Sequence, residues 1–380
     1  MPPLKDVSGI TNALPFWLSL LTVPLVAVGL VNGGWTVWIV PLYAWGMISI
    51  LDNIAGLELR NIDPQTPEDK LFWYHLVTII WFPIQFIMVF SAIYVLTRGD
   101  QFSGAARIGM MFGVGVASGS IGINYAHELM HRKGRLERWL ADLLMAMALY
   151  GHFRSEHLLV HHVHVATPHD AVTARYNEGF HRFFPRVLYQ CFISAWRAEK
   201  TLLARRQLPV LAPGNPFWRY GALQFAFLFL AYLLGGWAGI GLFAFQAFVA
   251  IWQLELVNYV EHYGLTRKYL GGGKFEHCKP QHSWNSAKKV SNLLLINLQR
   301  HSDHHFKPDR SFPLLQNHAK ESAPQLPFGY SVMTVMAMIP VLWRRRMNPR
   351  VRKWRAMYYP EVVDWSPYKI GHHSEPETAK

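Results

Sequence analysis

Nine histidines fall in four short clusters, and the imidazole nitrogen is the commonest side-chain ligand for metals in proteins. A single histidine pair on a helix is often found without a metal, but four separated clusters are hard to explain by packing. About four to six ligands satisfy one first-row metal ion, so nine imidazoles predict two ions. All-imidazole ligation suits iron, copper, zinc or nickel and leaves the choice among them open. The predicted ligands are His127, His131, His157, His161, His162, His262, His301, His304 and His305.

The spacing within the clusters predicts which histidines share a helical face. His127 and His131 are four residues apart in His-Glu-Leu-Met-His, so their rings lie about one turn apart on one face and can hold one ion. His157 and His161 should share a face in the same way. His162 should then point about 100° away, toward a neighbouring ion. The same reasoning applies to the third cluster, which has its histidines at i, i+3 and i+4.

Carboxylates stand next to these histidines, and metal-bound imidazoles usually donate their other ring proton to a carboxylate or carbonyl. Glu255 is a different case, because it lies inside an apolar segment, where an ionisable group is costly and by default functional. It shares a helical face with Asn258. We therefore expect a supporting set around the ligands, made of Glu128, Glu156, Glu255, Asn258, Glu261 and Asp303.

The remaining histidines of the 19 in the chain lie outside the clusters. His152 and His164 flank the second cluster, where they either support the ligands or have only local roles. The others are expected on the surface.

The elements that must position these residues are long apolar segments. Apolar residues make up 51% of the chain and charged residues 16%, whereas a soluble globular protein has about 25% charged residues. A helix of about 20 apolar residues crosses the hydrocarbon core of a bilayer. Six runs are long enough, at residues 14–31, 35–55, 71–96, 105–126, 217–234 and 237–259. A seventh run, at 139–150, is too short to cross and should pack beneath the others.

Glycines and basic residues predict the topology. Asn32-Gly33-Gly34 joins the first two runs and Gly235-Gly236 the last two, so each pair should form a tight helical hairpin. Most of the 37 lysines and arginines fall in residues 131–216 and 261–380, which the positive-inside rule places in the cytoplasm. The predicted fold is an all-α integral membrane protein with six transmembrane helices, cytoplasmic N- and C-termini and a cytoplasmic histidine-rich catalytic region.

Two parts of the chain are expected from this pattern. Residues 1–348 should form a six-span membrane domain with a cytoplasmic catalytic cap, and residues 349–380, which are charged and proline-punctuated, a cytoplasmic tail.

The two cysteines, Cys191 and Cys278, have no metal-type spacing, so a cysteine-ligated electron carrier within this chain is excluded. The net charge of +13 is spread around apolar runs, which favours a membrane-lipid environment and no nucleic-acid partner.

Three strings carry a resemblance to a known family. They are Asn-Tyr-Val-Glu-His-Tyr-Gly (258–264), Leu-Gln-Arg-His-Ser-Asp-His-His (298–305), and Glu-His-Leu-Leu-Val-His-His followed by Val-Ala-Thr-Pro-His-Asp (165–170). With the histidine spacings they resemble the integral-membrane di-iron alkane hydroxylases (alkane 1-monooxygenases), within the broader group of membrane fatty acid desaturases and hydroxylases. The resemblance runs from the first span to about residue 345.

The resemblance implies an activity and its cofactors. The two metals would be non-haem iron ions and O2 the co-substrate, in a bacterial inner-membrane monooxygenase that hydroxylates the terminal methyl of medium-chain n-alkanes to 1-alkanols. Trp45, on the second span, is then a candidate for limiting the depth of the substrate channel.

The resemblance also implies that electrons arrive from a rubredoxin reduced by rubredoxin reductase. A rubredoxin needs four cysteines, so the carrier must be a separate protein or a domain fused beyond Lys380. Rubredoxins are acidic, which makes the basic cytoplasmic surface around Arg344, Arg345 and Arg346 a candidate docking field.

Other functions compete with this interpretation. A fatty acyl desaturase or a xylene-type methyl hydroxylase would use the same histidine chemistry on a different substrate. A metal transporter or sensor would be expected to carry ionisable residues near mid-membrane on broken helices, whereas these histidines cluster at one end of the spans.

Overall fold

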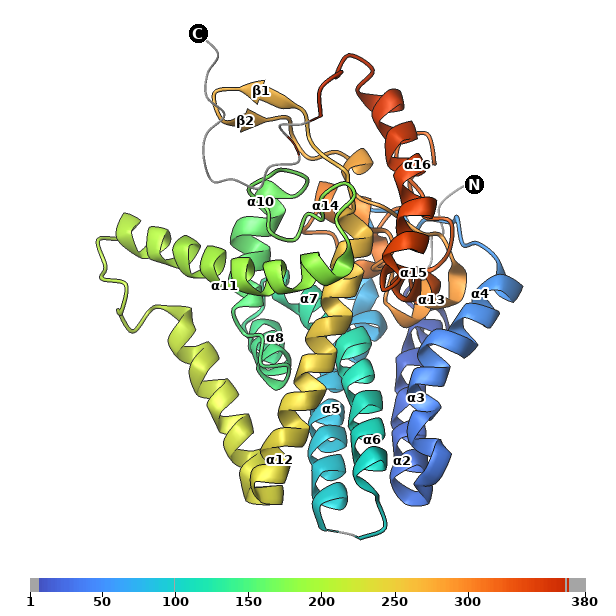
Figure 1. The fold of residues 1–380 in the computed structure, drawn as a ribbon, viewed down its shortest axis with the longest axis vertical. Helices are drawn as coiled ribbons and strands as arrows, with labels where there is room; N and C mark the ends of the chain where they lie inside the picture. Colours follow the sequence, from blue (N-terminus) through green and yellow to red (C-terminus); the bar gives the residue numbers. More distant parts are fainter. Residues whose placement is uncertain (1–6, 99, 366–367, 369–380) are drawn as a thin grey trace.

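The computed structural model describes residues 7–98, 100–365 and 368, and it is mostly helical, at 69%, with little sheet. Long helices form a bundle at one end of the molecule, and shorter helices and loops cover the other end (Figure 1). The predicted all-α membrane class is therefore supported.

Five helical segments of the described chain are long and apolar enough to cross a membrane: Ile10–Asn32, Gly34–Ala55, Glu68–Arg98, Gly104–Met130 and Pro216–His262. They contain α1 (Ile10–Ala13), α2 (Thr22–Asn32), α3 (Ile39–Pro41), α4 (Ile48–Ala55), α5 (Phe72–Arg98), α6 (Gly104–Ala117), α7 (Asn124–Met130) and α12 (Pro216–His262). Two of them include π-helical stretches, at Leu42–Met47 and Ser118–Ile123.

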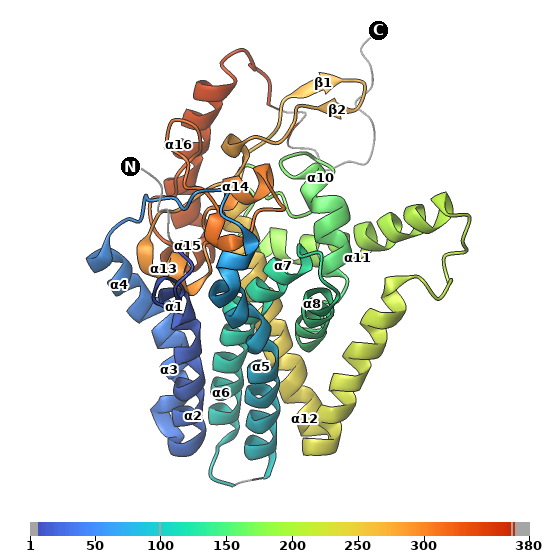
Figure 2. The ribbon, with the colours of Figure 1, turned by 180° about the vertical axis from the view of Figure 1, so that it is seen from behind.

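The predicted hairpin glycines turn the chain where they were expected to. Gly33 has φ +61, a left-handed conformation that only glycine adopts easily, and it separates α2 from the next helical segment. In α12 the backbone leaves the helical region at Gly235 and at Gly236, which has φ +59. There α12 folds back into two arms (Figures 1 and 2). The long segment thus contains both the fifth and the sixth predicted runs.

Other elements form a cap at the end of the bundle that carries the histidines (Figure 2). They are α8 (Arg135–Met147), α9 (Phe153–Glu156), α10 (His162–His164), α11 (Phe180–Arg205), β1 (Tyr269–Gly271), β2 (Lys274–Phe275), α13 (Lys289–Leu294), α14 (His301–Phe306), α15 (Tyr330–Ala337) and α16 (Pro340–Tyr358). Most of the seventh apolar run lies in α8, which ends at Met147 and contacts α7 and α12.

Three apolar cores hold the bundle and the cap together. One of them lies under the cap and includes Val351 and Trp354 of α16. The helix continues through Pro349, so the folded part of the chain extends past the predicted boundary at residue 348. Residues 366–367 and 369–380 of the predicted tail lie outside the described residues.

Candidate metal centre

All nine predicted histidines converge at the junction between bundle and cap. His127 lies in the last turn of α7, and His131 follows that helix directly. His262 is the last residue of α12. The other clusters belong to a helical stretch running from α9 through α10 and to the short helix α14. Segments far apart in the chain therefore meet at one level of the structure.

The nine residues form two groups, each of which could hold a metal ion. In each group the ligand atoms all lie within 4.8 Å of one another. We call His127, His131, His157, His162 and His304 the five-histidine group, and His161, His262, His301 and His305 the four-histidine group.

In the five-histidine group the Nε2 atoms face one another. Nε2 of His157 lies 3.0 Å from Nε2 of His131 and 2.9 Å from Nε2 of His162. Nε2 of His304 lies 3.2 Å from Nε2 of His162. The ring of His127 lies 4.5 Å from the rings of His157 and His304, measured between centroids.

The four-histidine group has the same construction. Nε2 of His301 lies 3.1 Å from Nε2 of His262 and 3.0 Å from Nε2 of His305. Nε2 of His161 lies 3.2 Å from Nε2 of His305. All four side chains are buried.

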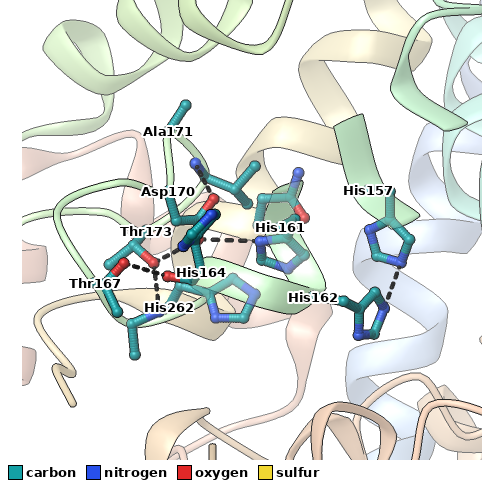
Figure 3. Close-up of polar contacts among 12 residues, drawn as sticks. His157, His161, His162, His164, Thr167, Asp170, Ala171, Thr173 and His262 are labelled. Carbon is teal, nitrogen blue, oxygen red and sulfur yellow. Dashed lines mark hydrogen bonds and ion pairs between the residues drawn. The ribbon is translucent and has the colours of Figure 1, made fainter. Parts of the chain in front are cut away.

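The histidines of the second cluster divide between the two groups differently from the prediction based on helical faces. His157 and His161 were expected to share a face, but they belong to different groups, and His157 lies with His162 instead (Figure 3). The reason is that His157–His161 is a π-helical turn. Its hydrogen bonds join residues five apart, so residue i+5 rather than i+4 comes to lie beside residue i. The third cluster follows the α-helical rule, with His301 and His305 in one group.

These contacts fit a metal ion better than hydrogen bonds between rings. A neutral imidazole has one ring N–H and one lone pair, yet Nε2 of His157 and of His301 each faces two other Nε2 atoms. Two nitrogens bound at right angles to one ion, each about 2.1 Å from it, would lie about 3.0 Å apart. The observed separations of 2.9 to 3.2 Å match this value.

Burial favours the neutral form of six of the imidazoles outside the spans. The pKa of His131 is lowered to about 4 by burial and by the nearby His161. Burial, with repulsion among neighbouring histidines, also lowers the pKa of His157, His162, His301, His304 and His305 well below the usual value. At neutral pH these rings therefore offer lone pairs for a metal.

Asp170 supports the four-histidine group and was not predicted. Its Oδ2 lies 3.0 Å from Nδ1 of His161 and accepts a hydrogen bond of 2.6 Å from the Thr173 hydroxyl (Figure 3). Burial alone would raise the pKa of Asp170, but His161 and Thr173 lower it to about 2. The ionised carboxylate holds the proton of His161 on Nδ1 and leaves Nε2 free to bind a metal. The available signal was the string Thr-Pro-His-Asp, which ends at this residue.

Two of the predicted supporting carboxylates lie deep in the site. Oε2 of Glu261 is 3.2 Å from Nε2 of His301, so this carboxylate lies among the ligand nitrogens rather than behind a ring. Its Oε1 accepts a 2.7 Å hydrogen bond from the Tyr330 hydroxyl. Glu255 accepts hydrogen bonds of 3.1 Å from the Tyr150 hydroxyl and from Nδ2 of Asn258.

Glu128, Glu156 and Asp303 are directed elsewhere. Glu128 accepts from the Phe312 backbone N–H, and Asp303 binds His318 and Arg310. Within the described chain both carboxylate oxygens of Glu156 are buried without a hydrogen-bond partner, and burial raises its pKa well above the usual range. In the described chain none of the three pairs with a ring nitrogen of the nine histidines. A residue next to a ligand in sequence points about 100° away around a helix, which explains the difference.

Histidines outside the clusters have other roles. His152 and His164 join neither group. His282 was expected on the surface, but it is fully buried, with Nε2 2.7 Å from the Tyr359 hydroxyl and Nδ1 accepting from the Lys279 backbone N–H. That prediction is wrong because the burying residue comes from a distant part of the chain. His372 and His373 lie outside the described residues.

A narrow pocket between the helices reaches both groups. It is lined by His127 and His157 of the five-histidine group and by His301 of the four-histidine group. Trp45 also lines it, and its ring lies 6.0 Å from Phe112 and 6.3 Å from Trp252. Leucine, isoleucine, valine and alanine side chains form much of the remaining wall.

Comparison with known proteins agrees with this site. The fatty acid desaturase family matches residues 103–337. Alkane 1-monooxygenase 2 of Alcanivorax borkumensis is 37% identical over 349 residues, which cover 90% of each chain. Alkane 1-monooxygenase 2 of Pseudomonas aeruginosa is 38% identical over 84% of this chain and 85% of its own. The xylene/toluene monooxygenase hydroxylase component of Pseudomonas putida is 25% identical over 91% of each chain.

The family match includes all nine histidines, and the matches to the alkane 1-monooxygenases extend over most of the chain. The two histidine groups fit a non-haem di-iron centre of this family. The chain thus belongs to the fatty acid desaturase family, among the alkane 1-monooxygenases.

Proposed function

We propose that the protein is a membrane-bound monooxygenase that converts the terminal methyl of medium-chain n-alkanes to 1-alkanols. The observation that carries this proposal is the meeting of two histidine groups at one narrow pocket between candidate membrane spans. Relatives named alkane 1-monooxygenase, 35 to 38% identical over most of this chain, support it. The xylene-type relative, at 25% identity, is less similar than these alkane 1-monooxygenases.

Each histidine group would hold one iron ion. The bound irons would supply the activation of O2, in which one oxygen atom enters a C–H bond and the other becomes water, with two electrons and two protons consumed. The chain contributes nine imidazoles as ligands, and Asp170 holds the ring of His161 through Nδ1. Glu261 places a negative charge among the ligand nitrogens of the four-histidine group.

The pocket would select the terminal carbon by shape, because an alkane offers no polar group to bind. A saturated chain partitions into the bilayer and can enter between the spans. Trp45, packed beside Phe112 and Trp252, would limit how far the chain extends away from the metals.

The proposed electron donor is a rubredoxin, separate or fused, with its reductase. A large basic cleft lies beside α11 and the β1–β2 hairpin. Among its described lining residues, Asp170 is the single acidic residue. Its basic side chains are Arg175, Arg186, Arg197, Arg205, Arg267, Lys274 and Arg355. Because Asp170 contacts both the cleft and His161, an acidic carrier docked there would lie close to the four-histidine group.

The proposed setting is the bacterial inner membrane. If both arms of α12 cross, the chain has six spans, and the positive-inside rule places the histidine end, the cap and both termini in the cytoplasm.

Purified protein can test the function directly. We expect about two irons per chain, and octane should yield 1-octanol when rubredoxin, its reductase and NADH are present. Less than about one iron per chain together with no octanol would end the proposal. A double bond formed in acyl chains would point to a desaturase instead.

A further inference from the structure

The pocket that reaches the histidine groups carries several polar side chains, and most of them have partners. The Asn124 amide donates to the Leu295 carbonyl, and the Asn258 amide donates to Glu255. The Ser331 and Thr334 hydroxyls donate to backbone carbonyls, at Ala44 and Tyr330. These groups are engaged within the protein and offer little to a ligand.

Gln253 differs from these residues. Gln253 lines the pocket and is 7% exposed, and its Oε1 is buried without a hydrogen-bond partner among the described residues. An unsatisfied buried acceptor of this kind carries a free-energy cost, because it has lost its hydrogen bond to water. A donor supplied by a ligand would remove that cost.

The position of Gln253 places it at the end of the pocket away from the metals. From Gln253 to His262 α12 advances nine residues, or about 13 Å at a rise of 1.5 Å per residue. On the facing wall, Gly119 and Ser120 lie at a similar helical distance before His127. Gly119 and Gln253 are in close contact, since a Cβ on Gly119 would lie 2.8 Å from Cβ of Gln253.

We propose that this pocket also takes chains with a hydroxyl at one end, and that the Gln253 amide binds this hydroxyl while the opposite methyl lies at the metals. The simplest such substrate is a medium-chain 1-alkanol, and the product is an α,ω-diol. The hydroxyl donates to Oε1 of Gln253, an interaction that an alkane cannot make. This inference rests on the proposed alkane hydroxylation, because it uses the same metals and the same pocket.

The reaction balances as in the proposed function. A C–H bond of the free methyl breaks and a C–O bond forms with one atom of O2, while the other atom leaves as water. Two molecules of the proposed reduced one-electron carrier supply the two electrons, and two protons are taken up. A 1-alkanol made from an alkane would have to leave and return in the opposite orientation, since its hydroxyl forms at the metal end.

The test compares octane and 1-octanol as substrates of the intact enzyme and its Gln253→Leu variant, with diol, aldehyde and octanol measured by gas chromatography. In the unmodified enzyme 1-octanol should give 1,8-octanediol. For each enzyme we compare kcat/KM for diol formation from 1-octanol with kcat/KM for octane hydroxylation. The ratio of the first to the second should be about tenfold lower in the variant, as expected for one lost hydrogen bond to a buried group. Gln253→Asn, which keeps an amide, should lose less of the ratio.

Gln246→Leu is the matched control. Gln246 lies two turns earlier on α12, and its buried Oε1 also has no hydrogen-bond partner in the part of the chain that the structure describes, but Gln246 does not line the pocket. It should leave the substrate ratio unchanged. The thermal transition in detergent shows whether Gln253→Leu folds. If it does not, two other measurements decide the question: the substrate ratio of Gln253→Asn, and the binding of radiolabelled 1-octanol to the unmodified protein, which 1,8-octanediol should displace.

The outcomes separate this inference from the proposed function. Octanol from octane without any diol from 1-octanol would overturn the inference and leave the proposed function standing. An equal substrate ratio in Gln253→Leu and the unmodified enzyme would mean that a water molecule satisfies the amide, and would also overturn it. No product from octane would reject the proposed function first.

Discussion

The two histidine groups are built from the same kind of ligand but lie in different surroundings. The five-histidine group has three partly exposed members, His127, His131 and His162, while every member of the four-histidine group is buried. The four-histidine group has one imidazole fewer, and carboxylates are in direct contact with it, through Asp170 behind a ring and Glu261 beside the ligand nitrogens. In the described chain no carboxylate pairs with a ring nitrogen of the five-histidine group.

This difference shows that two metal positions with the same ligand chemistry need not be equivalent. The group with carboxylates has negative charge to balance a cation and is shielded from solvent, so its ion should be held more firmly. The other group relies on imidazoles alone and has a more accessible side. Four experiments test this contrast, from the largest expected effect to the smallest.

The largest effect should come from removing one ligand of each group. His304 and His305 are neighbours in α14 but belong to different groups. We expect His304→Ala and His305→Ala each to lose about one of two irons and to reduce octane turnover by more than about 100-fold, because loss of a ligand should exceed the roughly 10- to 100-fold cost of losing its support. Iron content and product formation measure this.

The double variant gives the sharper result. If the groups are separate sites, the two changes together should remove both irons, and equal iron in single and double variants would contradict the division. His169→Ala is the control, because His169 lies near the site but in neither group.

Removing the carboxylate behind His161 should weaken one group selectively. Asp170→Asn removes the charge that faces Nδ1 of His161. We expect the metal affinity of the four-histidine group to fall by about 10- to 100-fold, with the other iron retained. Iron remaining after dialysis against increasing chelator measures the effect. Asp142→Asn, a buried acid paired with Arg154, should leave both irons in place; equal loss in both variants would indicate general destabilisation.

The difference in burial predicts two rates of metal loss. A chelator should remove iron in two phases, with the faster phase from the five-histidine group by roughly tenfold, because release from a fully buried site requires a larger local opening. Stopped samples assayed for iron give both rates. The fast phase should be missing in His304→Ala and the slow phase in His305→Ala, and a single phase in the unmodified protein would show that the groups do not differ in access.

The smallest effect should come from Tyr330→Phe. It removes the hydroxyl that donates to Glu261 and leaves one oxygen of a buried carboxylate unsatisfied, at a cost of about 1–3 kcal/mol. We expect a thermal transition lower by a few degrees and octane turnover reduced a few-fold. Tyr220→Phe, which loses a buried hydroxyl contact with Ser155, should lower stability without lowering iron content. Full iron content and unchanged turnover in Tyr330→Phe would show that the contact of Tyr330 with Glu261 does not contribute to the difference between the two groups.

Much of the fold could be predicted from the sequence, because the length and apolarity of a segment decide whether it can cross a bilayer. The hairpin glycines at 33 and 236 occupy left-handed conformations where the sequence placed turns. The continuation of α16 through Pro349 could not be predicted in the same way. Its sequence is strongly charged, and only two of its residues after Pro349, Val351 and Trp354, are buried in the core.

The candidate site was predictable as a set of residues, and its internal organisation was not. The clusters identified all nine histidines that the structure gathers. Asp170 was missed because its partner, His161, is reached through a turn rather than along one helical face. The carboxylates adjacent in sequence were favoured over it, although adjacency in a helix directs side chains apart.

The sequence by itself determined which segments can cross a membrane and which imidazoles are available to bind metals, because both depend on residue type and local spacing. Only the tertiary structure decided that a π-helical turn assigns His157 and His161 to different groups, that Asp170 and Glu261 reach the four-histidine group, and that Oε1 of Gln253 is buried without a hydrogen-bond partner in the described part of the chain. Those features depend on the exact path of the backbone and on distances between side chains, which the residue pattern along the chain does not encode.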